Sequence, residues 1–240
     1  MFNHVEFESD DFELKTVNED GKRWYVTDSG GRYPSITTVI SYFSRKAIME
    51  WRKRVGEEEA NKVALKASRR GTNVHLMCED YINNLPMKKE AMPSDLEMFH
   101  IMKPVLDERI GDVYAQEYAM YSDHLGIAGR CDCIAEFDGK LSIIDFKTSK
   151  RPLSAFGGEK LDKYFRQASG YAVMFEERTK IPVSQVVIIA AVDNELHPEV
   201  HVSKRDKHIG DLIGMIDEYY VKNGLTNKNN YQLTKGIIGI

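Results

Sequence analysis

The sequence predicts an α/β protein in which helices flank a central mixed β-sheet. Three observations lead to this class: an amphipathic helical pattern before residue 83, three successive strand patterns between residues 113 and 148, and a further helix and strand after them. A chain of 240 residues with 42% hydrophobic residues can bury a sizeable core. No internal repeat, low-complexity tract or Pro/Gly-rich linker divides the sequence, so we expect a single domain.

The first expected elements are a hairpin and one or two helices. Residues 12–27 read as a hairpin that turns at Glu19-Asp20-Gly21. The segment “YPSITTVISYF” begins with a Pro-Ser start signal and continues into a helical pattern. Residues 45–68 are rich in Ala, Glu, Lys and Arg, which favours one or two exposed helices.

A more sharply patterned helix is expected next, with Thr72 after Gly71 as its N-cap. Its apolar stripe repeats at helical spacing through Val74, Met77, Cys78, Tyr81 and Ile82. The neighbouring edge of this helix carries His75 and, one turn later, Glu79.

The rest of the chain alternates between helical and strand patterns. A helix is expected around 94–111, interrupted by Pro104. The later expectations are strands at 113–122, 127–137, 140–148 and 184–192, a helix at 160–178 and a C-terminal helix at 204–223.

Composition indicates the expected compartment of the protein and the kinds of partner that it lacks. No apolar run approaches the ~20 residues of a membrane helix, and the N-terminus is acidic where a secretory signal is basic and then apolar. We therefore expect an intracellular protein without a membrane partner. The net charge is −4, but residues 1–31 hold eight acids and three bases, so the remainder is close to neutral with basic clusters such as 66–70. The acidic segment is assigned either to packing on the core or to a position near a binding channel.

The three cysteines predict no disulfide framework. Cys78, Cys131 and Cys133 form no CxxC and no paired zinc spacing, and their number is odd. A reduced compartment fits this pattern. We assign the cysteines to core packing rather than to ligand binding.

The Asp138-Gly139 pair predicts a two-residue type I′ turn between two strands. With this turn Phe137 faces Lys140, and Asp132 directly opposes Asp145. Their Cβ atoms would lie about 5 Å apart on one face.

Opposed carboxylates repel one another unless a proton or a cation lies between them. Lys147 shares their face, because it lies two residues beyond Asp145. Carboxylates with a backbone carbonyl suit Mg²⁺ or Mn²⁺ better than zinc. Lys147 could then hold or deprotonate a water beside the metal, a combination suited to phosphodiester hydrolysis. The alternative is a charged strand end with a Lys-Asp ion pair. The opposite face is expected to be core, and carries Cys131, Cys133, Ile144 and Phe146.

These motifs resemble a known family. “GRCDCIA” at 129–135 and “IIDFKTSK” at 143–150 resemble the core of the PD-(D/E)xK nuclease superfamily. “RRGTNVHLMCEDYI” at 69–82 and “QASGY” at 167–171 are similar to the histidine helix motif and the glutamine–tyrosine motif of its RecB-type branch. The segments “PSITTVI” and “WRKRVGEEEA” are also similar to segments of exonucleases in this branch. The resemblance covers roughly residues 34–192 and implies a restriction-endonuclease-like core with an N-terminal hairpin and a helical elaboration.

The resemblance implies a set of site residues. His75, Asp132, Asp145 and the backbone carbonyl of Phe146 would bind the metal, and Lys147 would be the catalytic lysine. Glu79 would orient the site from behind the ligands. The residues expected to bind or position DNA are Gln167, Tyr171, Arg70, Thr72, Lys150 and Arg151. Some RecB-type nucleases hold an iron–sulfur cluster with cysteines near the C-terminus. No cysteine follows Cys133, so we expect no cluster.

The predicted function is a Mg²⁺/Mn²⁺-dependent DNA exonuclease, active on single-stranded DNA or DNA ends in replication, repair or recombination, and monomeric. Two alternatives remain: a non-catalytic DNA-binding or assembly module that keeps the nuclease fold, and a metal-dependent nuclease acting on RNA. The expected single nuclease domain, 1–240, consists of four parts: a hairpin extension (1–33), a helical part with the His motif (34–112), the catalytic core (113–192) and a C-terminal helical part (193–240).

Overall fold

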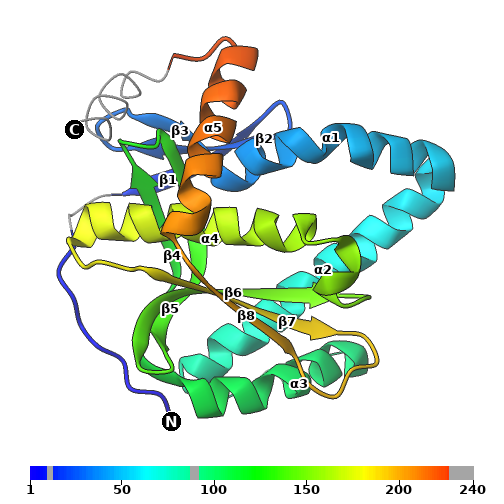
Figure 1. The fold of residues 1–240 in the computed structure, drawn as a ribbon, viewed down its shortest axis with the longest axis vertical. Helices are drawn as coiled ribbons and strands as arrows, with labels where there is room; N and C mark the ends of the chain where they lie inside the picture. The colour runs from blue at the N-terminus through cyan, green and yellow to red at the C-terminus, as the bar shows by residue number, and fades with distance from the viewer. Residues whose placement is uncertain (10–12, 87–91, 227–240) are drawn as a thin grey trace.

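A computed structural model describes residues 1–9, 13–86 and 92–226, and it has the predicted α/β class. Helices lie on both faces of a five-stranded mixed sheet, with α4 and α5 above the sheet and α3 below it in Figure 1. The arrangement agrees with a restriction-endonuclease-like core carrying an N-terminal hairpin and a helical elaboration. None of the helices in the described part of the chain combines the length and the apolar character that spanning a bilayer requires.

A small antiparallel sheet precedes the helices. It consists of β1 (Leu14–Glu19), β2 (Lys22–Thr27) and β3 (Arg32–Pro34). Asp20 and Gly21 form the β1–β2 turn with φ of 50° and 70°, as a type I′ turn requires. The predicted hairpin is therefore confirmed over the described residues. Strand β3 was not predicted, because it has only three residues.

Two long helices, α1 (Ile36–Val55) and α2 (Glu57–Ile82), follow and meet at Gly56. Gly56 has a φ of 86°, which an L-residue seldom adopts, so the break falls there. The predicted N-cap at Thr72 is wrong, since α2 runs without a break through Gly71 and Thr72. A glycine costs a helix only about 1 kcal/mol, and the second half of α2 is held by its buried stripe. Four of the five predicted stripe residues are buried: Val74, Met77, Cys78 and Ile82.

Helix α3 (Pro93–Arg109) also continues where an interruption was expected. Pro104 lies inside the helix, and the residues on either side of it remain helical. Met102 and Leu106 are both buried against the sheet. This packing holds the helix together on both sides of the proline.

The central sheet has the order β4-β5-β6-β7-β8. Its strands are β4 (Ile110–Ser122), β5 (Ile127–Phe137), β6 (Lys140–Ser149), β7 (Gln185–Val192) and β8 (Glu199–Lys204). All pairs are antiparallel except β6–β7, which the helix α4 (Glu159–Thr179) connects as a crossover. A short 3₁₀ helix, η1 (Leu153–Phe156), precedes α4. Strand β8 was not predicted, and it lies in the part that was expected to be helical.

The two faces of the sheet carry separate hydrophobic cores. One core joins the sheet to α1, α4 and the last helix, α5 (Asp206–Lys222). The other core joins it to α2 and α3. The three cysteines are free and buried in these cores, so their predicted packing role is confirmed.

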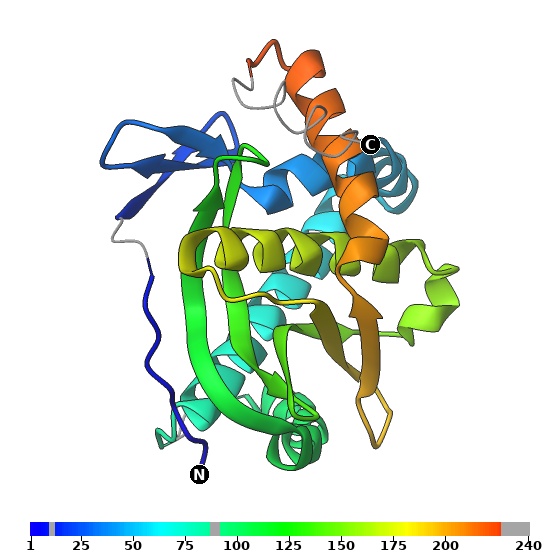
Figure 2. The same ribbon diagram turned by 60° about the vertical axis from the view of Figure 1, so that its left-hand side comes forward.

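The first residues of the chain cover the edge strand β4, beside which they run in Figure 2. His4 forms a bridge with Val113, and the Val5 amide donates to the Val113 carbonyl at 2.9 Å. Phe7 packs against the rings of Tyr118 and Phe175. Of the two roles proposed for the acidic N-terminus, packing on the core is therefore the observed one for residues 1–9. This cover protects an otherwise open sheet edge.

Candidate metal centre

A pocket of about 440 Å³ opens between the small sheet, α2 and the central sheet. Its lining combines side chains from β2, the start of α1, α2, β4, β5, β6 and α4. Most of the side chains that bear on metal chemistry come from the α2 and β5 segments singled out in the sequence. We call this cavity the metal pocket.

Three potential metal ligands meet in the metal pocket. One ligand atom each from His75, Glu117 and Asp132 lies within 4.8 Å of the others. His75 Nδ1 is 3.4 Å from Asp132 Oδ2. The ring of Phe146 supports the imidazole edge-on, with 6.3 Å between the ring centroids. One imidazole and two carboxylates form a donor set that suits a divalent cation.

Asp132 lies where β5 separates from β6. The predicted register holds from Phe137↔Lys140 to Cys133↔Ile144, where the backbone pairing ends. Beyond that point Asp132 Oδ2 accepts a hydrogen bond from the Phe146 amide at 2.9 Å. The predicted direct pairing of Asp132 with Asp145 is therefore absent from the described β5–β6 ladder. The hydrogen bond from the Phe146 amide to the Asp132 side chain replaces the next backbone–backbone hydrogen bond of the ladder.

The two cysteines beside Asp132 report the same irregularity. In a regular strand Cys131 and Cys133 would share a face. Cys131 instead packs with the α4 core, and Cys133 packs with the α2–α3 core beside Ile144 and Phe146. The expectation that both cysteines lie on one core face is wrong, because the strand does not keep its regular alternation of faces across Asp132.

Glu117 is a site residue that the sequence reasoning missed. It lies in β4 with a φ of 47°, between the pairs Gln116↔Cys133 and Tyr118↔Cys131. It therefore stands opposite Asp132. Burial raises the pKa of the Glu117 carboxyl, and the nearby charges of Asp132 and Glu79 raise it further. A cation between these groups would relieve that repulsion.

A sequence signal for Glu117 existed. The strands β4 and β5 are joined by the short turn 123–126, and Ser122 pairs with Ile127. Counting back from that turn pairs position 117 with position 132. The same procedure that aligned β5 with β6 would have found a second acid facing Asp132.

The buried Asp145 and the partly buried Lys147 form a pair beside the metal pocket. Asp145 is 1% exposed, and its Oδ2 is in an ion pair with Lys147 Nζ. Burial raises the pKa of Asp145 to about 6; Lys147 opposes this shift and Asp132 adds to it. Burial lowers the pKa of Lys147, but the charges of Asp145 and Asp132 outweigh it, so the pKa is raised overall. The amine is thus held as an ammonium ion. Its side chain also lines the metal pocket.

Gln167 and Tyr171 lie one turn apart on α4 and face this pair. Gln167 Nε2 donates to Tyr171 Oη at 3.2 Å and reaches Asp145 Oδ1 at 3.5 Å. Both side chains line the metal pocket. Gly129 allows the Tyr171 ring to lie against β5, because a Cβ at Gly129 would be 2.5 Å from Tyr171 Cε1. Gly170 allows α4 to lie against α1, because a Cβ there would be 2.3 Å from Ile36 Cδ1.

The remaining predicted residues are placed less uniformly. Glu79 and Thr72 line the metal pocket, Thr72 as an exposed residue. Arg70 pairs with Asp193 Oδ1 at 2.5 Å and lines a different cavity. Lys150 and Arg151 are exposed in the segment after β6, and neither lines the metal pocket.

The small N-terminal sheet contributes residues that were not predicted. Arg23 and Tyr25 of β2 line the metal pocket, together with Ser35 and Thr37 at the start of α1. Arg130 of β5 lines it too, and its guanidinium lies 3.9 Å from Glu117 Oε2. The hairpin extension therefore forms part of the site wall.

Two curated proteins match part of the chain. Human mitochondrial genome maintenance exonuclease 1 is 28% identical over 129 residues, which is 50% of this chain and 37% of that protein. The same protein of Xenopus tropicalis is 29% identical over 133 residues, which is 52% of this chain and 38% of that protein. The chain thus spans less than two fifths of the length of these relatives. The similarity shows a nuclease-like relationship, as the sequence motifs predicted.

Comparison with solved structures gives a weaker likeness. A crystal structure of SSO0001 aligns with a TM-score of 0.44 and 13% identity, covering 78% of this chain and 74% of the other. No family model matches the chain.

Proposed function

We propose that the protein is a Mg²⁺- or Mn²⁺-dependent deoxyribonuclease of the RecB-type PD-(D/E)xK branch, acting as an exonuclease on single-stranded DNA or DNA ends. The observation that carries this proposal is the meeting of His75, Glu117 and Asp132 in a pocket that Lys147 also lines. The names of the two curated relatives, both genome maintenance exonucleases, support the same class of substrate. A monomer in an intracellular compartment, with a role in DNA replication, repair or recombination, completes the proposal.

The donor set fits a divalent cation. His75, Asp132 and Asp145, with the Phe146 carbonyl, are the ligands expected from the motifs, and Glu117 adds a carboxylate from β4. A bound Mg²⁺ or Mn²⁺ would lower the pKa of a water and neutralise charge that develops on the phosphate. Glu79 would orient the metal ligands without binding the metal itself. Its charge on α2 already raises the pKa of Glu117.

Lys147 contributes a fixed positive charge. Asp145 holds its ammonium group, and the Tyr164 ring lies 5.0 Å from Nζ. An ammonium in this position donates hydrogen bonds to a phosphate oxygen or to the attacking water, and its geometry is set before substrate binds. Gln167 and Tyr171 keep Asp145 in place by contact with its other oxygen and with each other.

The mouth of the metal pocket suits a nucleic-acid backbone. Arg23 and Arg130 place two guanidinium groups in its lining. Phosphate contacts of this kind hold a strand without reading its sequence. This favours trimming of DNA ends over recognition of a particular site.

An end-labelling experiment tests the proposal. Single-stranded DNA, double-stranded DNA and RNA are incubated with the protein in Mg²⁺, Mn²⁺ or EDTA, and product lengths are followed in time. We expect short products from single-stranded DNA or DNA ends in either metal and none in EDTA. The Asp132→Asn variant should lower the rate more than about 100-fold.

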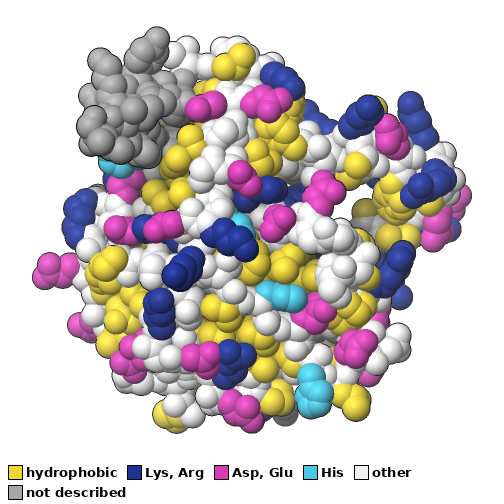
Figure 3. All heavy atoms as spheres, in the orientation of Figure 1, with side chains coloured by type: hydrophobic (Ala, Val, Ile, Leu, Met, Phe, Trp, Pro, Cys, Tyr) yellow, Lys and Arg dark blue, Asp and Glu magenta, His cyan; other side chains and the backbone are white. Residues whose placement is uncertain are grey.

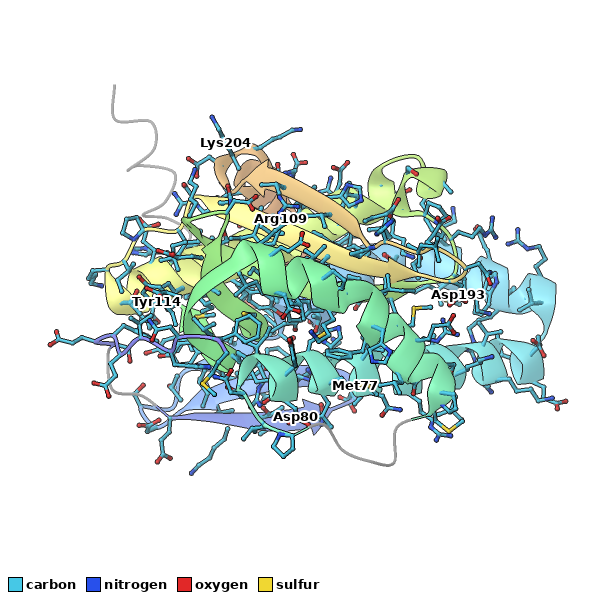
Figure 4. All side chains as sticks on the ribbon, turned by 90° about the horizontal axis from the view of Figure 1, so that it is seen from below. Met77, Asp80, Arg109, Tyr114, Asp193 and Lys204 are labelled. Carbon is cyan, nitrogen blue, oxygen red and sulfur yellow. The ribbon has the colours of Figure 1, made fainter. Side chains whose placement is uncertain are left out.

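The matched control is Asp80→Asn, since Asp80 is on α2 outside the pocket lining (Figure 4). Absence of cleavage by the wild type in both metals would favour the non-catalytic DNA-binding alternative. Cleavage of RNA in preference to DNA would favour the other alternative.

A further inference from the structure

A second cavity lies on the neighbouring face of α2, between that helix and the start of α3. It measures about 270 Å³. The two helices lie side by side in Figure 4, in front of the sheet in this view from below. Its lining residues are Lys62, Leu65, Lys66, Arg69, Arg70 and Asn73 of α2, with Met92, Ser94 and Asp95. We call this cavity the strand groove.

The strand groove is strongly cationic. Four of its nine lining residues are Lys or Arg, and Asp95 is the one acid among them. Asp95 is buried and its carboxylate accepts hydrogen bonds from Asn73 at 2.6 Å and Ser94 at 3.3 Å, so its charge is already solvated within the fold. Figure 3 shows Lys and Arg side chains on the arm formed by α1 and α2, with Asp and Glu side chains among them.

Two of the four cations have no partner among the residues that the structure describes. Lys62 pairs with Glu58 and Arg70 pairs with Asp193. Lys66 and Arg69 are exposed, and within residues 1–9, 13–86 and 92–226 neither forms an ion pair or a side-chain hydrogen bond. Exposed cations without partners are available to an anion from outside the chain.

The groove also exposes apolar side chains beside these cations. Leu65 is 64% exposed and Met92 is 55% exposed. Leu65 precedes Lys66 and lies one turn before Arg69, so an apolar group lies beside the cationic groups in the groove. A single nucleic-acid strand presents the matching pair of groups, with phosphates on its backbone and unpaired bases beside it.

The groove adjoins the metal pocket along α2. Arg69 of the groove and Thr72 of the metal pocket are three residues apart on α2, which makes them neighbours on the helix surface. At 1.5 Å per residue, Arg69 lies about 9 Å along the helix from His75, and Lys62 about 20 Å from it. At about 3.4 Å per stacked nucleotide, these distances correspond to about three and about six nucleotides.

We infer that the strand groove is a second binding site for single-stranded nucleic acid, in which Lys66 and Arg69 hold phosphates and Leu65 and Met92 contact bases about three to six nucleotides from the metal pocket. This inference rests on the proposed function for the position of the cleaved bond. It goes beyond it by assigning a length requirement to the substrate and a separate set of residues to strand retention.

Binding measurements in EDTA test the inference without hydrolysis. Labelled oligothymidylates of three and twelve nucleotides are titrated with the wild type and with the Lys66→Gln/Arg69→Gln variant. We expect the variant to bind the twelve-nucleotide strand at least tenfold more weakly and the three-nucleotide strand equally well. The slope of log affinity against log salt should fall by about 1.4, because two phosphate contacts of about 0.7 each are lost.

The control is Lys140→Gln/Lys204→Gln, which removes the same charge from two exposed positions outside both cavities. Equal loss of affinity in both variants, equal loss for both strand lengths, or failure of the wild type to bind the twelve-nucleotide strand would each overturn the inference. A preference for duplex over single strand would overturn it too. Binding without hydrolysis in Mg²⁺ or Mn²⁺ would refute the proposed function alone.

Discussion

The metal pocket and the strand groove lie on neighbouring faces of α2, yet they hold their charges in opposite ways. Beside the metal pocket Asp145 is buried and forms an ion pair with Lys147, whose side chain is 16% exposed. In the strand groove Lys66 and Arg69 are exposed. Buried charges interact strongly and are little affected by salt, whereas exposed ones are screened. One face of the helix is therefore organised for fixed geometry, and the other for reversible attraction.

The largest effect is expected for Lys147→Met. Loss of the ammonium removes a hydrogen-bond donor at the metal pocket, so cleavage should slow by about 10²–10³-fold. The loss should be the same at low and high salt, unlike the loss in the Lys66→Gln/Arg69→Gln variant. Rates on single-stranded DNA across a salt series measure both. Lys140→Met, at the other end of β6, is the matched control and should retain the wild-type rate.

If Lys147→Met retained more than a tenth of the wild-type rate, the pairing with Asp145 would be structural. That result would favour the charged strand end considered as an alternative from the sequence. Thermal unfolding of the variant separates a loss of chemistry from a loss of fold, because Asp145 is left buried without its partner.

A smaller effect is expected for Glu117→Gln. The change keeps the shape of the side chain but removes its charge, so the affinity for Mn²⁺ should fall about 10–100-fold. Titration calorimetry with Mn²⁺ measures this directly, beside Glu108→Gln, which alters an exposed acid of α3. An unchanged Mn²⁺ affinity would remove Glu117 from the ligand set and leave His75 and Asp132 to act with Asp145.

The backbone of the candidate site was predictable where the residue types of a turn fix its conformation. Asp138 and Gly139 have φ of 53° and 72°, so the residue types alone set the register of β5 against β6. The positions of His75 and Gln167 followed from motif resemblance and helical spacing. Glu117 could have been found in the same way as the β5–β6 register, by counting back along β4 from the turn 123–126 to the position opposite Asp132. Its left-handed conformation has no such local signal, because it is unusual for a non-glycine residue and depends on the strands around it.

The fold was predictable where local pattern and packing agree. The strands from 113 to 148 and the helix before β7 were placed within a few residues. The cap at Thr72 and the break at Pro104 were wrong for the same reason: each rests on a local preference of about 1–3 kcal/mol, which the burial of several neighbouring apolar side chains outweighs. Strand β8 was missed because it forms by pairing with β7, and local sequence patterns do not reveal that pairing.

The rigidity of the metal pocket can be tested through Gly129→Ala. The added methyl group would meet the Tyr171 ring, which cannot bend away as an aliphatic chain can. We expect the free energy of unfolding to fall by about 1–3 kcal/mol. Chemical denaturation measures it. Gly210→Ala is the control, since no atom lies near that Cβ and the residue is within α5; it should be neutral or slightly stabilising.

The smallest expected effect is on the pH dependence of the free energy of unfolding, and it comes from His208, which lines neither cavity. His208 is buried, stacks on Phe165 at 4.8 Å and contacts Ser203 Oγ at 2.8 Å through Nε2. Burial lowers the pKa of His208 below its ordinary 6.5; the charges of Lys207 and Arg166 lower it further, and those of Asp162 and Asp211 oppose this.

Just below pH 6.5 the unfolded chain therefore binds more protons at this residue than the folded chain does, so the free energy of unfolding rises with pH in that window. This stability is complete above the unfolded pKa and is lost as the pH falls. Urea midpoints at about pH 5 and about pH 8 should differ less in His208→Gln than in the wild type. An equal difference in both proteins would assign the acid sensitivity to other groups, with the buried carboxylates of the metal pocket as the first to examine.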